Sequence, residues 1–171
     1  MKFKNIVNKF ISVYFTLIGY VASKSSARCR VFIGNVLGDF MRLVGRRRMK
    51  ITLDNLSHAF PEKSESEIKR IAKASFRNMG ITLVEISSFE WFSDDDFRKF
   101  VKYDNIEIIN KLREQKRGII LMSGHFGNWE AVAYTAGLFT GVPITIVVKR
   151  QKNADVDQKI NKFRTRSGNK I

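Results

Sequence analysis

A histidine and a glutamate five residues apart are the side chains of this sequence best suited to acid–base chemistry. They are His125 and Glu130, within the segment at residues 123–130, SGHFGNWE. A neutral imidazole takes a proton from an alcohol near neutral pH, and a carboxylate on its other nitrogen fixes the tautomer and stabilises the imidazolium that forms. The pair therefore has the composition of a general-base dyad.

The spacing of this pair restricts where the backbone can place it. On one continuous α-helix, residues five apart point roughly 140° away from each other and cannot share a hydrogen bond. The two side chains converge only if His125 lies in a turn and Glu130 in the first turn of a helix, with Gly124 and Gly127 allowing the backbone to bend. Exposed N–H groups at such a helix N-terminus also favour an ionised carboxylate and help to hold a developing oxyanion.

Other chemistry has less support. The HEXXH pattern is absent and the second histidine, His58, lies far upstream, so a zinc site lacks its ligands and no metal is expected. The three aspartates at residues 94–96 point in different directions, and no further metal ligand lies at a spacing that would let it join them. This pattern favours a helix cap over a metal site. Ser123 is not part of a G-x-S-x-G pattern, which disfavours a hydrolase nucleophile. A purely structural His125 stays an open alternative, because one histidine and one acid are a weak signal.

The elements around the pair predict an α/β domain. Residues 118–123 (GIILMS) form a short apolar run after a glycine, typical of a buried strand, and residues 144–149 (ITIVVK) predict a second strand. Residues 129–139 predict a helix between them, which ends at Gly141. We therefore expect a βαβ unit, a partial parallel sheet with flanking helices, whose active-site edge carries the His125 turn.

Two further helices are predicted upstream. Ser64 and Glu67 have the spacing of a capping box, and apolar side chains recur at threes and fours over residues 64–88. Gly80 within this helix suggests a close packing contact. Residues 104–115 predict a second amphipathic helix.

The net charge of +15 is concentrated at the two ends of the chain. Residues 1–50 carry eleven Lys or Arg against one acid, and residues 141–171 carry eight against two. Basic ends beside apolar residues are attracted to anionic lipid headgroups, by about 1 kcal/mol for each Lys or Arg near the surface. Nucleic acid would attract them equally well, so a non-catalytic basic protein that binds membranes or nucleic acid is the alternative from another class.

The N-terminal residues 1–50 predict a basic, apolar, membrane-anchoring helical segment in front of a domain at residues 51–171. The uncharged stretch between Lys9 and Lys24 is 14 residues long. As a helix it covers about 21 Å, against a hydrocarbon core of about 30 Å, so we expect an interfacial helix or helical hairpin. A cleaved signal peptide and a buried core helix are the alternatives.

Residues 123–130 also resemble a known motif. SGHFGNWE resembles the H-x4-D/E motif of the lysophospholipid acyltransferase superfamily, and its glutamate resembles the branch of bacterial lipid A lauroyl/myristoyl acyltransferases. NLSHAFPE, NMGITLVE, VVKRQKN and INKFRTRSG are similar to other segments of that family, in order, from about residue 45 onward. The resemblance implies that residues 51–171 are an acyltransferase domain incomplete at its C-terminus, in a chain that looks like an N-terminal portion.

The resemblance implies a reaction and roles for individual residues. The reaction is transfer of a fatty acyl chain from acyl carrier protein to a hydroxyl of a lipid A precursor, at the cytoplasmic face of the bacterial inner membrane, with His125 as general base and Glu130 as its partner. Gly124 and Gly127 would form the turn and oxyanion region, and neither a cofactor nor nucleic acid is expected. An acyltransferase acting on a glycerolipid, a lysophospholipid or a phosphoinositide mannoside is the nearest alternative. Phosphates need cationic partners, and the residues expected to bind substrate are Asn128, Arg150, Arg164 and Arg166.

Overall fold

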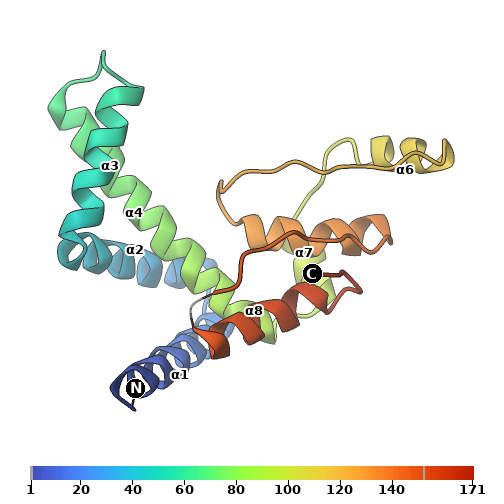
Figure 1. Cartoon of the computed structure of the whole chain (residues 1–171), viewed down its shortest axis with the longest axis horizontal. Coiled ribbons are helices and arrows are strands. Elements are labelled where there is room, and N and C mark those ends of the chain that lie inside the picture. Colours follow the sequence, from blue (N-terminus) through green and yellow to red (C-terminus); the bar gives the residue numbers. More distant parts are fainter. Residues whose placement is uncertain (1, 152) are drawn as a thin grey trace.

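All regular secondary structure in the described residues of this computed structural model is helical (Figure 1). The structure describes residues 2–151 and 153–171, and the side chains of all of these except residues 2–8 and 10. In chain order the elements are α1 (Lys2–Lys24), α2 (Ala27–Val44), α3 (Arg46–Ala59), α4 (Glu65–Ser88), the 3-10 turn η1 (Phe89–Trp91), α5 (Asp94–Phe100), α6 (Glu107–Glu114), α7 (Trp129–Thr140) and α8 (Ala154–Thr165).

Helix α4 is the central element, and its start follows from a capping box. The Ser64 side chain accepts a hydrogen bond from the Glu67 N–H, while the Glu67 carboxylate accepts one from the Ser64 N–H at 2.9 Å. This exchange satisfies N–H groups that the first turn of a helix leaves free. The helix predicted over residues 64–88 is confirmed. It packs against α1, α2 and α3 (Figure 1). The turn η1, which follows its C-terminal end, contacts α8.

The contact between α2 and α4 is a close approach of two backbones. A Cβ added at Gly80 of α4 would overlap the carbonyl oxygen of Gly34 and the backbone nitrogen of Gly38, both in α2, so the predicted packing role of Gly80 is confirmed. An ion pair also joins these helices, with Nη2 of Arg77 2.6 Å from Oδ2 of Asp39. The hydrogen bond from Arg77 lowers the pKa of the Asp39 carboxyl. The two helices are therefore joined by both close packing and charge.

A cluster of aromatic side chains forms the core between the C-terminal helices. Phe89, Phe97, Tyr134 and Phe163 come from η1, α5, α7 and α8, and all four are buried. The rings of Phe97 and Tyr134 have centroids 4.9 Å apart, and those of Tyr134 and Phe163 4.5 Å apart. Aromatic pairs at such distances stabilise a core beyond the area that they bury. The cluster holds α7, and with it the start of that helix, against the rest of the chain.

The predicted α/β fold is wrong for the residues that the structure describes. Residues 118–123 and 144–149 form no strand, and the described chain contains only an isolated parallel bridge, between Thr145 and Lys170. Val147, expected inside a sheet, is 97% exposed. Two parallel strands alone are not stable, because such sheets need further strands and a cover on both faces. Short apolar runs without that cover do not form a sheet, and the described fold is all-helical.

The other predicted helices are present. Helices α6 and α7 correspond to the predictions for residues 104–115 and 129–139, and Ser93 caps α5 by accepting a hydrogen bond from the Asp96 N–H at 3.2 Å. Two helices, α1 and α2, lie in the N-terminal segment. The boundary predicted at residue 50 falls within α3, and the division into an anchoring segment and an acyltransferase domain stays a prediction.

Candidate active site

The predicted dyad lies where an irregular segment turns into α7. Asn128 caps this helix, since its side-chain oxygen accepts a hydrogen bond from the Ala131 N–H at 3.1 Å. Gly127 has a φ of 50°, a left-handed conformation that other residues rarely adopt, and Gly124 lies half-buried just before it. We call residues 123–128 the motif loop. The predicted strand in front of this loop is absent, but the turn into a helix N-terminus is present.

His125 lies on the surface of the motif loop. Its side chain is exposed, and its ring packs against the indole of Trp129 with centroids 4.9 Å apart and ring planes at 58°. A general base has to reach the proton that it removes, and an exposed imidazole meets this requirement. Among the hydrogen bonds of the described residues, none joins His125 to Glu130. The dyad is therefore not assembled in this structure.

Glu130 is buried and paired with a cation from another helix. Its side chain is 6% exposed, and Arg164 of α8 donates to both of its oxygens, from Nε to Oε2 at 2.8 Å and from Nη2 to Oε1. Nη1 of Arg164 donates to the side-chain oxygen of Asn161 at 3.1 Å. A buried carboxylate needs such a partner, because an unpaired buried charge costs several kcal/mol. Arg164, predicted to bind substrate, is thus engaged inside the protein by the predicted catalytic acid.

Trp129 connects the two predicted catalytic residues. Its indole N–H donates to Oε1 of Glu130 at 3.2 Å, while its ring contacts that of His125. The side chains therefore form a continuous series from the exposed imidazole through the indole to the buried carboxylate and Arg164. From the sequence, Trp129 is indicated only as one of the residues between the histidine and the glutamate.

Two residues of α4 contact the motif loop, and the spacing argument from the sequence does not identify them. Oε2 of Glu85 accepts a hydrogen bond from Nδ2 of Asn128 at 2.8 Å. The Thr82 hydroxyl donates to the carbonyl oxygen of Gly127 at 3.2 Å. Residues three apart share one face of a helix, so a polar pair within the otherwise apolar stretch at residues 80–86 was the signal that could have found them.

Comparison with known proteins decides the family. A sequence model of the family described as "Bacterial lipid A biosynthesis acyltransferase" matches residues 6–171, nearly the whole chain. The chain belongs to this family. The resemblance drawn from the segment at residues 123–130 and its companions is confirmed.

Curated relatives carry related names. The chain is 28% identical over 107 residues to the lipid A biosynthesis palmitoleoyltransferase of Escherichia coli (strain K12), which is 63% of this chain and 35% of that protein. It is 31% identical over 106 residues to the lipid A biosynthesis lauroyltransferase of the same organism, 62% of this chain and 35% of that one. It is 34% identical over 96 residues to a lipid A biosynthesis acyltransferase of Haemophilus influenzae, 56% and 30%. The chain thus covers about a third of the length of these relatives. No solved structure matches it significantly.

Two further arginines were predicted to bind substrate in this member of the family. Arg150 is exposed in the irregular segment before α8. Arg166 instead binds groups of the protein: Nε donates to the Tyr134 hydroxyl oxygen at 3.0 Å, Nη2 donates to Asp94 at 3.2 Å, and the guanidinium lies 4.9 Å from the centroid of the Tyr134 ring. Burial raises the pKa of the Tyr134 hydroxyl, which donates to Asp94. Arg166 is thus bonded within the protein, and its role toward substrate stays a prediction.

In the described part of the chain, no group of three or more His, Cys, Asp or Glu side chains is placed so that it could hold a metal ion. The other histidine, His58, lies on α3, with Nδ1 2.7 Å from the carbonyl oxygen of Asp54. It is exposed and contributes nothing to the motif loop. His58 therefore serves as a natural control for experiments on His125.

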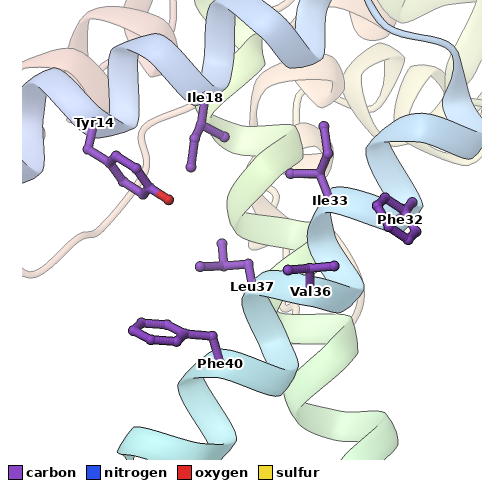
Figure 2. A pocket seen from close by; sticks show the side chains of 7 residues that line it. All are labelled: Tyr14, Ile18, Phe32, Ile33, Val36, Leu37 and Phe40. Carbon is purple, nitrogen blue, oxygen red and sulfur yellow. The ribbon is translucent and has the colours of Figure 1, made fainter.

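An apolar groove of about 370 Å³ lies between α1 and α2. Figure 2 shows Tyr14 and Ile18 of α1 facing apolar side chains of α2 across it. Phe32 and Phe40 at its rim are 67% and 59% exposed. Among the described residues, no helix is both long enough and apolar enough to cross a membrane. The side chains that line the groove are Tyr14, Ile18, Phe32, Ile33, Val36, Leu37 and Phe40.

Proposed function

We propose that this family member transfers a fatty acyl chain from acyl carrier protein to a hydroxyl of a lipid A precursor, with His125 as general base and Glu130 as its partner. The observation that carries the proposal is an exposed imidazole linked through Trp129 to a buried, charge-paired carboxylate at the start of a helix. The names of the relatives in Escherichia coli and Haemophilus influenzae support lipid A as the product class.

The proposed reaction moves one acyl group and one proton. His125 removes the proton of the acceptor hydroxyl while the hydroxyl oxygen attacks the carbonyl carbon of the thioester. The tetrahedral intermediate then collapses, the C–S bond breaks, the acyl group stays on the acceptor as an ester, and the imidazolium returns its proton to the leaving thiolate. N–H groups at the start of α7 lie at the positive end of the helix dipole and stabilise the oxyanion.

The dyad requires His125 and Glu130 to meet when the acceptor is bound. Hydrogen bonds between catalytic groups are often long or misaligned without substrate and tighten in the complex. Trp129 supports such an arrangement, because it already contacts the imidazole and the carboxylate. Arg164 keeps the carboxylate at one place while the exposed imidazole moves.

Of the predicted substrate residues, Arg150 is the one that we assign to the phosphates of the acceptor. It is exposed, whereas Arg164 and Arg166 are bonded to protein carboxylates. A guanidinium binds phosphate through two parallel N–H donors, provided that no protein carboxylate occupies them. Asn128 caps α7 and binds Glu85, and its role toward substrate stays a prediction.

We also propose that α1 and α2 lie in the membrane interface, at the cytoplasmic face of the bacterial inner membrane. Large apolar side chains are exposed on both helices and around their groove. Residues 1–50 carry eleven basic side chains against one acid. A basic amphipathic helix pair binds anionic lipid by burying apolar area and by attracting the headgroups. Such binding would keep the motif loop near a lipid acceptor.

The test is transfer of a labelled acyl chain from acyl carrier protein to a tetraacylated lipid A precursor, with membranes that carry the chain or its variants. His125→Ala is expected to abolish transfer, whereas the matched control His58→Ala retains it. A lysophospholipid offered as the acceptor in parallel separates lipid A acylation from glycerolipid acylation. Equal transfer by wild type and His125→Ala, or no transfer by the wild type, would overturn the proposal.

A further inference from the structure

We infer that Glu85 and Thr82 on α4 are positioning residues, which hold the motif loop so that His125 stands at the right place for proton transfer. The inference rests on the proposed function for its catalytic consequence. Its structural content, that these two side chains fix the loop, stands on contacts that are independent of the reaction.

Asn128 makes the first of these contacts and uses both ends of its side-chain amide. The oxygen accepts from the Ala131 N–H at 3.1 Å and caps α7, while the nitrogen donates to Oε2 of Glu85 at 2.8 Å. A carboxylate is the stronger kind of acceptor for such a donor. Glu85 therefore fixes the rotamer of the cap, and the cap fixes where the loop enters the helix.

Thr82 makes the second contact, to the backbone. Its hydroxyl donates to the carbonyl oxygen of Gly127 at 3.2 Å, and Thr82 is 5% exposed. Gly127 is the loop residue with the left-handed backbone conformation, at φ 50°. A hydrogen bond at this residue holds the bend that separates His125 from α7.

The motif loop has little other support. Ser123, His125, Phe126 and Gly127 are all exposed, so burial of their side chains contributes little to the position of the loop. The ring contact of His125 with Trp129 is local, since it joins the loop to the first residue of α7. Among the hydrogen bonds of the described residues, the two that the loop makes with α4 tie it to a distant part of the chain.

Helix α4 is suited to this role because it is itself well fixed. Gly80, two residues before Thr82, lies against the backbone of α2, and Val84, one residue before Glu85, is fully buried. Thr82 and Glu85 are three residues apart and share one face of the helix. The position of the loop therefore depends on the position of α4, which is fixed by its packing against α2.

Loss of these contacts should affect the chemical step more than acceptor binding. A base displaced by about 1 Å can cost up to about 100-fold in rate, because proton transfer depends on geometry. We expect Glu85→Ala and Thr82→Val to lower kcat roughly 10- to 100-fold with KM nearly unchanged. Glu85→Gln and Thr82→Ser keep an acceptor and a hydroxyl, and should retain most of the activity.

The experiment measures the loop and the reaction on the same chain. The two histidines give only two sets of imidazole NMR signals, with His58 on α3 as an internal control for His125. Glu90→Ala, at an exposed acid in η1, is the matched control variant. Glu85→Ala and Thr82→Val should shift or broaden the signals of His125 and leave those of His58 unchanged, while the conservative variants and the control should match the wild type.

The outcomes separate this inference from the proposed function. Unchanged His125 signals in both Glu85→Ala and Thr82→Val overturn the positioning role, whatever the activity. Shifted His125 signals with kcat equal to that of Glu90→Ala overturn its catalytic consequence. A wild type without acyl transfer overturns the proposed function, but the His125 signals still decide whether α4 fixes the loop.

Discussion

Replacing Arg164 with methionine is expected to destabilise the fold by about 3 to 5 kcal/mol, because it leaves the Glu130 carboxylate buried without a cation. The two side chains are 8% and 6% exposed, and Arg164 donates to both carboxylate oxygens. The remaining donor to Glu130 among the described side chains is the Trp129 N–H at 3.2 Å. Methionine fills much of the space of the arginine stem, so the loss reports the charge more than a cavity.

Urea unfolding measures this loss directly, and a thermal scan should show Tm lower by roughly 6 to 20 °C for a chain of this size. The matched double variant, Arg164→Met with Glu130→Gln, removes the buried charge together with its partner and should recover a large part of the stability. If Arg164→Met alone stays within about 1 kcal/mol of the wild type, the reasoning that this pair compensates a buried charge is refuted.

Three further predictions concern the N-terminal helices. Since the hydrogen bond from Arg77 lowers the pKa of Asp39, the ionised pair stabilises the fold above the ordinary carboxyl pKa and loses this effect as the pH falls through the folded-state pKa. Asp39→Asn should therefore lower Tm near pH 7, and the difference from the wild type should shrink below about pH 4; a difference independent of pH would contradict this. Gly80→Ala should cost about 1 to 3 kcal/mol in urea unfolding because its Cβ meets the backbone of α2, whereas Gly118→Ala, with open space around it, should cost far less; equal costs would contradict the close contact. Phe40→Ala, at an exposed rim residue of the apolar groove, should weaken binding to vesicles rich in anionic lipid by roughly 10- to 100-fold, and unchanged binding would count against the interfacial role of α2.

The sequence predicts the helices of this fold better than their arrangement. The capping box of Ser64 and Glu67 and the apolar period after it are local features, and both reappear in α4. The runs at residues 118–123 and 144–149 have strand-like composition, but a strand exists only where a neighbour accepts its hydrogen bonds. Composition does not report whether such a neighbour is present, and this is why the α/β prediction failed.

At the candidate site, too, local features could be predicted from the sequence and contacts between distant residues could not. A bend at Gly127 followed by a helix could be predicted from the glycines before the helix, whereas the meeting of His125 with Glu130, for which that bend was inferred, is not present in this structure. The partner of Glu130 could not, since Arg164 is 34 residues away and its guanidinium suits a phosphate as well as a carboxylate. The support from α4 is equally non-local and depends on the packing of that helix.

The central claim is that His125 is the general base of an acyl transfer to a lipid A precursor. Its most direct test is the single-turnover rate of labelled acyl transfer from acyl carrier protein, compared between the wild type, His125→Ala and His58→Ala. The account predicts loss of transfer in His125→Ala alone, with the general-base contribution accounting for at least about 100-fold. A His125→Ala rate equal to that of His58→Ala would contradict it.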